Sequence, residues 1–277
     1  MRILAAQIQI PATDTRASQQ ANIRSSLERL GAQLESHPVD LVLLPELSTM
    51  HYSTENFQHI DQFSEELYGE SFELFSSFCR THNVAVCYGL ARREGADTYI
   101  SHVALGRQGQ YLTHYDKIHV AEYGDSSESR YFKRGNHLAP FEIDGVRAGI
   151  IICYDMRFPE LTRLYCQKLD VDIILHPVAF AQDCSFHSWK QFVVSRALEN
   201  QVFFMSLNRA GPHFGHSIIC PPWIDDQVQP TVFGESEEFR IFDIDLGVAN
   251  MVRQKIPFRR DALESYQVLP VRKSTSS

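Results

Sequence analysis

The sequence predicts an α/β fold in which two β-sheets pack face to face and helices cover their outer faces. The chain has 277 residues, of which 44% are hydrophobic and 22% charged, so it is long enough for one large core. Apolar runs of strand length alternate with helical patterns in two successive halves. Two βα-rich halves with long buried strands favour two stacked sheets with helices outside.

The first half has the order strand, helix, strand, helix, strand. We expect a strand at 2–10, a helix capped by Asp14 and ending near Glu35, a strand at 39–44, a helix at 65–82 and a strand at 84–90. The second of these helices is amphipathic, because its apolar residues recur at helical spacing. This half therefore opens as a βαβαβ unit.

The middle of the chain changes its pattern. Between 99 and 115 polar and apolar residues alternate around Gly106 and Gly109, which predicts an antiparallel pair, and 119–136 is polar and irregular. We then expect strands at 141–143 and 146–152 joined at Asp144-Gly145, a helix at 159–168, a strand at 171–176, a helix at 186–200 and strands at 202–207 and 239–245. A helix or arm should follow Gly247.

Composition and charge exclude several classes of protein. The net charge of -8 and a pI near 5.8 argue against a nucleic-acid surface. The start of the chain is too short in apolar length for a signal peptide, and no run approaches the roughly 20 apolar residues that span a bilayer. We expect a cytoplasmic protein with one domain over 1–268 and a polar tail over 269–277.

Six cysteines lie at positions 79, 87, 153, 166, 184 and 220, without a Cys-x-x-Cys pair. In a chain without a secretory signal they indicate free thiols, most of them small core residues. The twelve histidines form no His-Glu-x-x-His motif. We therefore expect neither a metal nor a cofactor.

Cys153 stands at the most informative point of the chain. Three isoleucines of a buried strand end abruptly at this thiol, and a helix is expected to begin near Pro159. A sharp strand-to-helix turn presents a side chain to a pocket, with backbone N–H groups nearby to favour a thiolate or an oxyanion. Two further residues can act together with this thiol. Glu46 ends the apolar run 40–46, and Lys117 lies in the run Tyr115-Asp-Lys-Ile-His119.

Glu46, Lys117 and Cys153 together resemble the Glu, Lys and Cys triad of the nitrilase, or carbon-nitrogen hydrolase, superfamily. The resemblance extends over nearly the whole chain, from about Met1 to about Val268. It rests on 44–47 (Pro-Glu), 115–119 (Asp-Lys-x-His), 149–160 (Gly-x-x-x-Cys-Tyr-Asp-x-Arg-Phe-Pro-Glu), 176–180, 189–200, 208–211 (Asn-Arg-x-Gly) and 259–261 (Arg-Arg-x-Asp). Several such segments in the family's order make a chance match very improbable.

The resemblance implies a four-layer α-β-β-α sandwich and pairing into a homodimer or higher homo-oligomer. It also implies that Cys153 attacks a carbonyl, Glu46 moves the proton, and Lys117 stabilises the oxyanion together with the N–H of Tyr154. Glu128 is similar to the family's second active-site Glu and is expected to position Lys117. Glu122 and Asp125 are nearer to Lys117 in sequence and could take this part instead.

The substrate pocket is less well defined by the sequence. Arg157, four residues after Cys153, could bind a substrate carboxylate with its fork or could form a structural ion pair with Asp155 or Glu160. Its environment decides between the two. We expect three aromatic residues to line the pocket, namely Tyr52, Tyr154 and Phe180.

The resulting hypothesis is an amidase that hydrolyses a small, carboxylate-bearing or neutral amide to acid and ammonia through a thioester. The run 153–160 is closest to the ω-amidase branch, whereas Pro221-Pro-Trp223 departs from the usual Asp-Pro-x-Gly and leaves the substrate open. An N-carbamoyl amidohydrolase or a nitrilase of the same superfamily is an alternative. From other classes, a non-catalytic scaffold and a redox-sensing thiol protein remain, although Cys166 is poorly placed as a resolving thiol.

Overall fold

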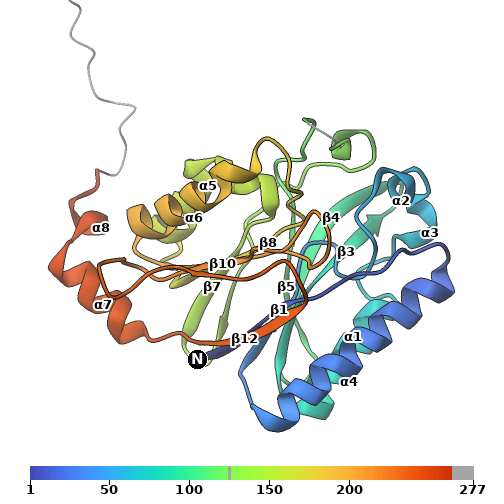
Figure 1. Ribbon diagram of the computed structural model, residues 1–277, viewed down its shortest axis with the longest axis horizontal. Coiled ribbons are helices and arrows are strands. Elements are labelled where there is room, and N and C mark those ends of the chain that lie inside the picture. The colour runs from blue at the N-terminus through green and yellow to red at the C-terminus, as the bar shows by residue number, and fades with distance from the viewer. Residues whose placement is uncertain (124–125, 264–277) are drawn as a thin grey trace, which may run out of the picture.

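The computed structural model describes residues 1–123 and 126–263, which form two six-stranded sheets between two layers of helices (Figure 1). The helices α1 (Arg16–Ser36) and α4 (Glu70–His82) lie on one side, and α5 (Pro159–Lys168) and α6 (Phe186–Asn200) lie on the other. This arrangement confirms the predicted α-β-β-α sandwich. The tail expected at 269–277 and the alternative carboxylate Asp125 lie outside the described residues.

The first sheet has the order β12-β1-β2-β3-β4-β5. Its strands are β1 (Arg2–Gln7), β2 (Leu41–Leu43), β3 (Ala85–Glu94), β4 (Asp97–Leu105), β5 (Tyr111–Asp116) and β12 (Glu238–Asp243). The strands β1, β2 and β3 are parallel, as the βαβαβ pattern requires, and the remaining pairs are antiparallel. The carboxyl ends of β2 and β3 therefore point to the same edge.

The second sheet repeats this plan with the order β11-β10-β9-β8-β7-β6. Its strands are β6 (Pro140–Ile143), β7 (Val146–Ile150), β8 (Ile173–Pro177), β9 (Phe203–Leu207), β10 (Ile218–Cys220) and β11 (Thr231–Val232). Again the three central strands, β7, β8 and β9, are parallel. The helices α7 (Leu246–Lys255) and α8 (Phe258–Asp261) follow β12, so a helix stands beyond Gly247.

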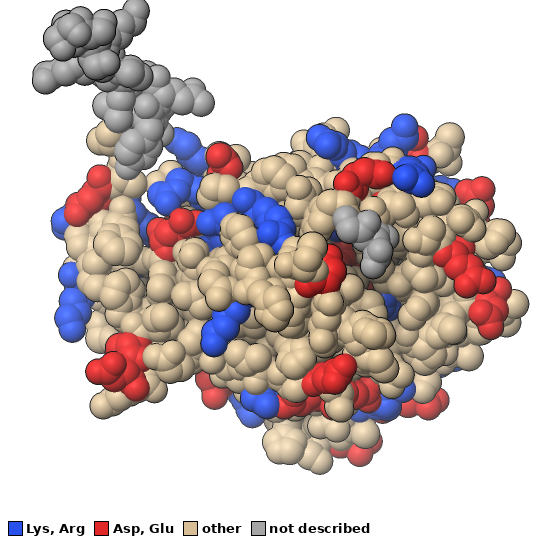
Figure 2. Space-filling view, turned by 45° about the horizontal axis from the view of Figure 1, so that its top comes forward, with Lys and Arg blue, Asp and Glu red and all other residues tan. Residues whose placement is uncertain are grey.

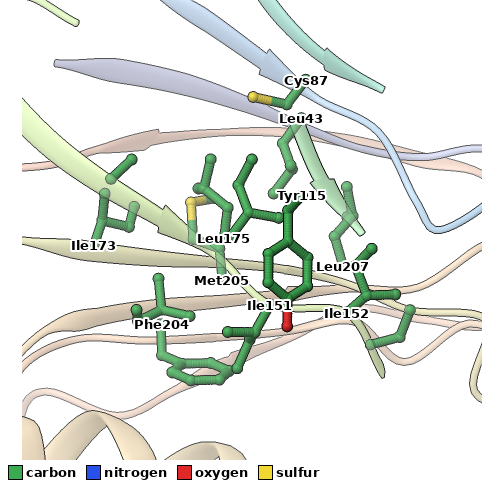
Figure 3. Close-up of a cluster of buried hydrophobic side chains, with 14 of the residues drawn as sticks. Leu43, Cys87, Tyr115, Ile151, Ile152, Ile173, Leu175, Phe204, Met205 and Leu207 are labelled. Carbon is green, nitrogen blue, oxygen red and sulfur yellow. The ribbon is translucent and has the colours of Figure 1, made fainter. Parts of the chain in front are cut away.

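The main core lies between the two sheets, and strand alternation decides which residues enter it. In β1, Ile3 and Ala5 face the second sheet, whereas Leu4 and Ala6 face α1 and α4. Figure 3 shows the inter-sheet core, with Leu43 and Cys87 opposite Leu175 and Met205. This dry layer carries the strand ends on which the candidate site is built.

Several expected boundaries shift for local reasons. Thr15, not Asp14, caps α1, because its side chain accepts from the Ser18 N–H while Ser18 bonds back to the cap. The helix expected from Glu65 begins at Glu70, because Glu65 pairs with Arg92 as an isolated bridge and its carboxylate binds the Ser71 N–H. The short elements α2 (Thr54–Gln58), α3 (Ile60–Phe63), β10 and β11 were not expected.

The surface mixes charges of both signs. On the face drawn in Figure 2, Lys and Arg side chains are interspersed with Asp and Glu side chains. Within the described part of the chain, no helix is long and apolar enough to cross a membrane.

Candidate active site

Glu46 follows β2 at a turn that the chain can make only against a glycine. Leu47 has a φ of 47°, in the left-handed region that a branched side chain rarely adopts. Gly89 of β3 lies against this turn so closely that a Cβ there would stand 2.5 Å from the Leu47 nitrogen. The turn therefore packs backbone against backbone, and the Glu46 carboxylate points into the interior, where it is 1% exposed.

Lys117 follows β5 and places its ammonium between two carboxylates. Its Nζ donates to Glu46 Oε1 at 2.9 Å and to Glu128 Oε1 at 2.7 Å. All three side chains are buried, with Lys117 and Glu128 at 0% exposure. Two carboxylates and one ammonium thus form a compact cluster from segments that are far apart in the sequence.

Glu128 takes the position predicted for the second carboxylate. It begins the 3-10 turn η1 (Glu128–Arg130), and besides Lys117 it accepts from the Tyr52 hydroxyl at 2.7 Å and from the Ala121 N–H at 2.7 Å. The alternative Glu122 is exposed and bonds Ser129 and Arg130. Of the two described candidates, Glu128 is therefore the one that contacts Lys117.

Cys153 lies on a strained turn between strand and helix. The strand β7 ends at Ile150, earlier than expected, and a 3-10 turn η2 (Cys153–Arg157) connects it to α5 at Pro159. Cys153 itself has a φ of 45°, the left-handed region, although it is not a glycine. Backbone strain of this kind clusters at functional sites, and here it presents the thiol to a cavity that Glu128 also lines.

The turn is tied to the Lys117 segment by a carboxylate that the sequence reasoning did not single out for this role. Asp155 accepts from the Ile152 N–H at 3.0 Å, from the Tyr115 hydroxyl at 2.8 Å and from the His119 N–H at 2.9 Å. Tyr115 and His119 lie on either side of Lys117 in the sequence. Their hydrogen bonds to Asp155 therefore hold the Cys153 turn, which follows β7 of the second sheet, against the Lys117 segment, which follows β5 of the first. The sequence signal for this role was the position of Tyr115 and His119 on either side of Lys117.

The electrostatics keep the thiol neutral. Burial and the nearby Glu46 carboxylate raise the pKa of Cys153 well above its usual value, and the Lys117 charge only partly opposes them. Burial also raises the pKa of Glu46, against the attraction of Lys117. Burial lowers the pKa of Lys117, but Glu128 and Glu46 outweigh it and hold the ammonium charged.

A cavity of about 240 Å³ lies in front of the thiol. Its lining consists of Tyr52, Ser53, Thr54, Phe57, Ala121, Tyr123, Ser126, Glu128, Cys153, Ala179, Phe180, Ala181, Asp183 and Phe214. Tyr52 and Phe180 thus line it as predicted. Among the described residues the ring of Tyr154 does not line it, because this ring packs on Tyr123 and Phe158 instead. The cavity is small, five of its fourteen lining residues are aromatic, and Asp183 is its second carboxylate beside Glu128.

Arg157 lies behind the aromatic residues that line the cavity and is not itself one of the lining residues. Its guanidinium faces the rings of Tyr123, Phe180 and Phe192 at 5.8, 5.8 and 5.1 Å, and its Nη1 lies 3.4 Å from Ser188 Oγ. Its Nε and Nη2 are buried and have no hydrogen-bond partner among the described residues. The structure, over its described residues, gives it no ion pair with either carboxylate considered from the sequence.

Comparison with known proteins gives a consistent result. The family model of the carbon-nitrogen hydrolases matches residues 4–254. The 2-oxoglutaramate amidase of Bacillus subtilis (strain 168) is 30% identical over 80% of this chain and 85% of that protein. The human omega-amidase NIT2 is 29% identical over 82% and 85%.

The fold has solved counterparts as well. The structure of Saccharomyces cerevisiae Nit3, a member of branch 10 of the nitrilase superfamily, aligns with a TM-score of 0.81 at 22% identity over 97% of each chain. At this identity the likeness shows the fold. It agrees with the α-β-β-α sandwich described above.

Proposed function

The chain belongs to the carbon-nitrogen hydrolase family as an amidase with an active-site cysteine, and we propose that Cys153 is the nucleophile with which it releases ammonia from a small amide. One observation carries this assignment. Lys117 joins Glu46 and Glu128 in a closed cluster of buried charges, and Cys153 and Glu128 line the same cavity. The proposal requires these groups, as nucleophile, proton carrier and oxyanion donor, to reach the same carbonyl group. Its support is that the charges of Glu46 and Lys117 lie near enough to act on the pKa of the Cys153 thiol.

The first half-reaction forms the thioester. Cys153 Sγ attacks the amide carbon while its proton passes to Glu46, and the carbonyl oxygen becomes an oxyanion that the Lys117 ammonium and the Tyr154 N–H stabilise. Glu46 then gives this proton to the amide nitrogen, the C–N bond breaks and ammonia leaves. In the second half-reaction Glu46 takes a proton from water, the hydroxide attacks the thioester, and the proton returns to Cys153 as the acid departs.

The directions of the pKa shifts suit this sequence of steps. A thiol whose pKa is raised stays protonated at rest, so it needs a base in contact with it rather than a preformed thiolate. A carboxyl group whose pKa is raised by burial is a stronger base than an exposed one and can return the proton to the leaving group. Glu128 keeps the Lys117 ammonium charged and directed toward the oxyanion position.

The substrate we propose is a small amide with a carboxylate elsewhere in the molecule. Its support is the similarity to a 2-oxoglutaramate amidase and an omega-amidase, together with a cavity of about 240 Å³ that suits a short chain. Arg157 is the cation on the turn of the nucleophile, and two of its nitrogen atoms lack a partner among the described residues. Tyr123 and Phe180 both line the cavity and face the guanidinium, so binding a carboxylate there requires these aromatic side chains to rearrange.

We further propose a homodimer in the cytoplasm, with the catalytic domain ending near residue 268. Exposed apolar side chains on the outer helices, Leu164 at 45% and Met251 at 59%, support self-association. All six cysteines are free, which is typical of a reducing compartment. Light scattering coupled to size exclusion will measure the mass, and a monomeric mass at micromolar concentration contradicts the dimer.

Intact-protein mass spectrometry during turnover tests the nucleophile. With 2-oxoglutaramate in excess, we expect an acyl adduct on wild-type protein, located at Cys153 by peptide mapping, and none on Cys153→Ala, which should lose turnover with its fold intact. Cys153→Ser should lose turnover as well, because Glu46 alone does not readily ionise a hydroxyl. Cys184→Ala, which removes an exposed thiol, is the control and should keep both adduct and rate.

The same experiment separates the alternatives. A sulfenate on Cys153 without an acyl adduct would indicate a redox sensor, and no adduct of any kind would indicate a scaffold. Butyramide, N-carbamoyl-β-alanine and a short nitrile, tested beside 2-oxoglutaramate, distinguish neutral-amide, carbamoyl and nitrile preferences. Turnover retained in Cys153→Ala would contradict covalent catalysis at this residue.

A further inference from the structure

The strained backbone of Cys153 is held by a histidine that the proposed mechanism does not use. His176 Nε2 lies 2.9 Å from the carbonyl oxygen of Cys153. His176 is on β8, which lies beside β7 in parallel, so its side chain reaches the turn that follows β7. The residue is fully buried, and its ring packs edge-on against Phe204.

The histidine is the middle of a longer chain of hydrogen bonds. Its Nδ1 lies 2.8 Å from Ser206 Oγ, and the same hydroxyl lies 2.8 Å from Trp189 Nε1. His176 and Ser206 are direct partners in the parallel pair of β8 and β9, and Trp189 lies above them on α6. None of the three side chains is more than 1% exposed.

The two ends of the chain determine the direction of every hydrogen bond in it. An indole N–H can only donate, so Trp189 donates to Ser206. A backbone carbonyl can only accept, so His176 must carry its proton on Nε2 and donate to Cys153 O. In a neutral ring Nδ1 is then an acceptor, and the Ser206 hydroxyl, whose lone pair receives the indole N–H, donates to Nδ1. One neutral tautomer satisfies all members.

We propose that Trp189, Ser206 and His176 form a positioning chain that fixes the Cys153 carbonyl and thereby directs the thiol and the Tyr154 N–H into the cavity. The inference rests on the proposed role of Cys153 as nucleophile. A peptide unit is planar, so pinning the carbonyl of Cys153 also sets the direction of the next N–H. The chain makes no contact with the reacting atoms, so its members are positioning residues.

The surroundings of His176 support a fixed neutral ring. Burial lowers its pKa to about 4, with Asp155 opposing and Lys117 reinforcing this shift. At neutral pH the ring therefore keeps an acceptor for Ser206 and does not take part in proton transfer. On the other side of the turn Asp155 binds the Ile152 N–H, so the turn is anchored through both its carbonyl and its preceding amide.

Alkylation of Cys153 by iodoacetamide tests the chain without knowledge of the substrate. Peptide mass spectrometry will follow Cys153 and the exposed Cys184 in the same sample, so that Cys184 serves as the internal reference. Ser206→Ala should slow alkylation of Cys153 relative to Cys184 and lower kcat, each roughly tenfold to a hundredfold, with KM nearly unchanged. His176→Phe should do at least as much, whereas His176→Gln, which offers a donor and an acceptor, should recover part of the rate.

Ser71→Ala is the matched control, because Ser71, in the first turn of α4, is also a fully buried serine whose hydroxyl donates to a buried partner, Glu65. It should lower the melting temperature without changing the ratio of the two alkylation rates. Equal ratios in Ser206→Ala and Ser71→Ala would overturn the positioning role. So would a His176 variant with reduced stability and an unchanged ratio.

Nitrogen-15 spectra of the histidines provide an independent readout. The positioning chain requires a protonated Nε2 and an unprotonated Nδ1 at His176 between pH 6 and 8. Assignment of a proton to Nδ1 would overturn the proposal. Because this measurement involves no turnover, its failure is distinguishable from retained turnover in Cys153→Ala, which would contradict the nucleophile itself.

Discussion

The two sheets each contribute one strained turn to the site, and the turns are stabilised in different ways. Leu47 after β2 and Cys153 after β7 both have a φ near the left-handed helix, 47° and 45°. The first turn carries a carboxylate and is held by close backbone packing on Gly89 and by the ammonium of Lys117. The second carries a thiol. It is held by a hydrogen bond from His176 to the Cys153 carbonyl and by a hydrogen bond from the Ile152 N–H to the Asp155 carboxylate.

This difference follows from the chemistry of the two side chains. A buried carboxylate is costly unless a cation and hydrogen bonds compensate it, so the Glu46 turn needs Lys117, and Lys117 in turn needs Glu128. A buried thiol is close to an apolar group and needs no counter-charge. The Glu46 side of the site is therefore held together mainly by compensating charges, whereas the Cys153 side is held mainly by the geometry of its hydrogen bonds. The two sides should respond differently to substitution.

The largest effect is expected from removing the shared cation. Lys117→Met leaves two buried carboxylates without compensation, so the free energy of unfolding should fall by about 3–5 kcal/mol and kcat by roughly a hundredfold to a thousandfold. Chemical denaturation and steady-state kinetics measure both. The control Lys133→Met, at a side chain 66% exposed beside Asp97, should stay within about 0.5 kcal/mol of wild type. Wild-type kcat in Lys117→Met would contradict the oxyanion assignment.

Arg157 tests whether the Cys153 side also carries a charge that the substrate must compensate. If the physiological amide bears a carboxylate that reaches Arg157, Arg157→Met loses a charged hydrogen bond of about 1.5–3 kcal/mol. The value of kcat/KM should then drop roughly tenfold to a hundredfold on 2-oxoglutaramate and little on butyramide. An equal loss on both substrates with a lower melting temperature would make Arg157 structural, held by its aromatic neighbours, and Arg130 and Arg134 would be the next cations to test.

Gly89 tests the packing of the Glu46 turn. A Cβ at this position would stand 2.5 Å from Leu47 N and 2.9 Å from Pro45 O. Both are backbone atoms, so neither can move without moving the whole turn. Gly89→Ala should cost about 1–3 kcal/mol of stability and lower kcat, because Glu46 moves with the turn. Gly95→Ala, at an open hairpin turn with a φ of 61°, should cost stability only. A stability loss without any change in kcat would separate the turn from the chemistry.

The smallest expected effect is a shift of the pH profile. Burial raises the pKa of Glu46, Lys117 lowers it, and Glu128 raises it. Glu128→Gln removes a negative charge, so Glu46 loses its proton more easily and the acid limb of kcat/KM should move to lower pH. Lys117→Met should move the same limb to higher pH. Shifts in the same direction for both variants would show that another group governs this limb.

The sequence alone determined much of the architecture and indicated the groups that we propose to react. The helices 159–168 and 186–200 have the predicted bounds and the hairpin turns at Asp144-Gly145 as predicted, because turn residues, an initial proline and helical periodicity are local signals. Cys153 and Glu46 each stand at the end of an apolar run, and Lys117 was indicated by the run Tyr115-Asp-Lys-Ile-His119. Glu128 could be selected over Glu122 only by its place in a motif.

The tertiary structure decided what these local signals do not contain. Glu46 and Lys117 are 71 residues apart in sequence. Their strand ends come together only because β2 and β5 belong to one sheet, in the order β2-β3-β4-β5. Glu65 lies outside its expected helix because its buried carboxylate accepts a hydrogen bond from the Ser71 N–H. The contact of His176 with Cys153 depends on the register of β7 with β8. Propensity and periodicity act over a few residues, whereas compensation of a buried charge or a strained carbonyl depends on which strands become neighbours.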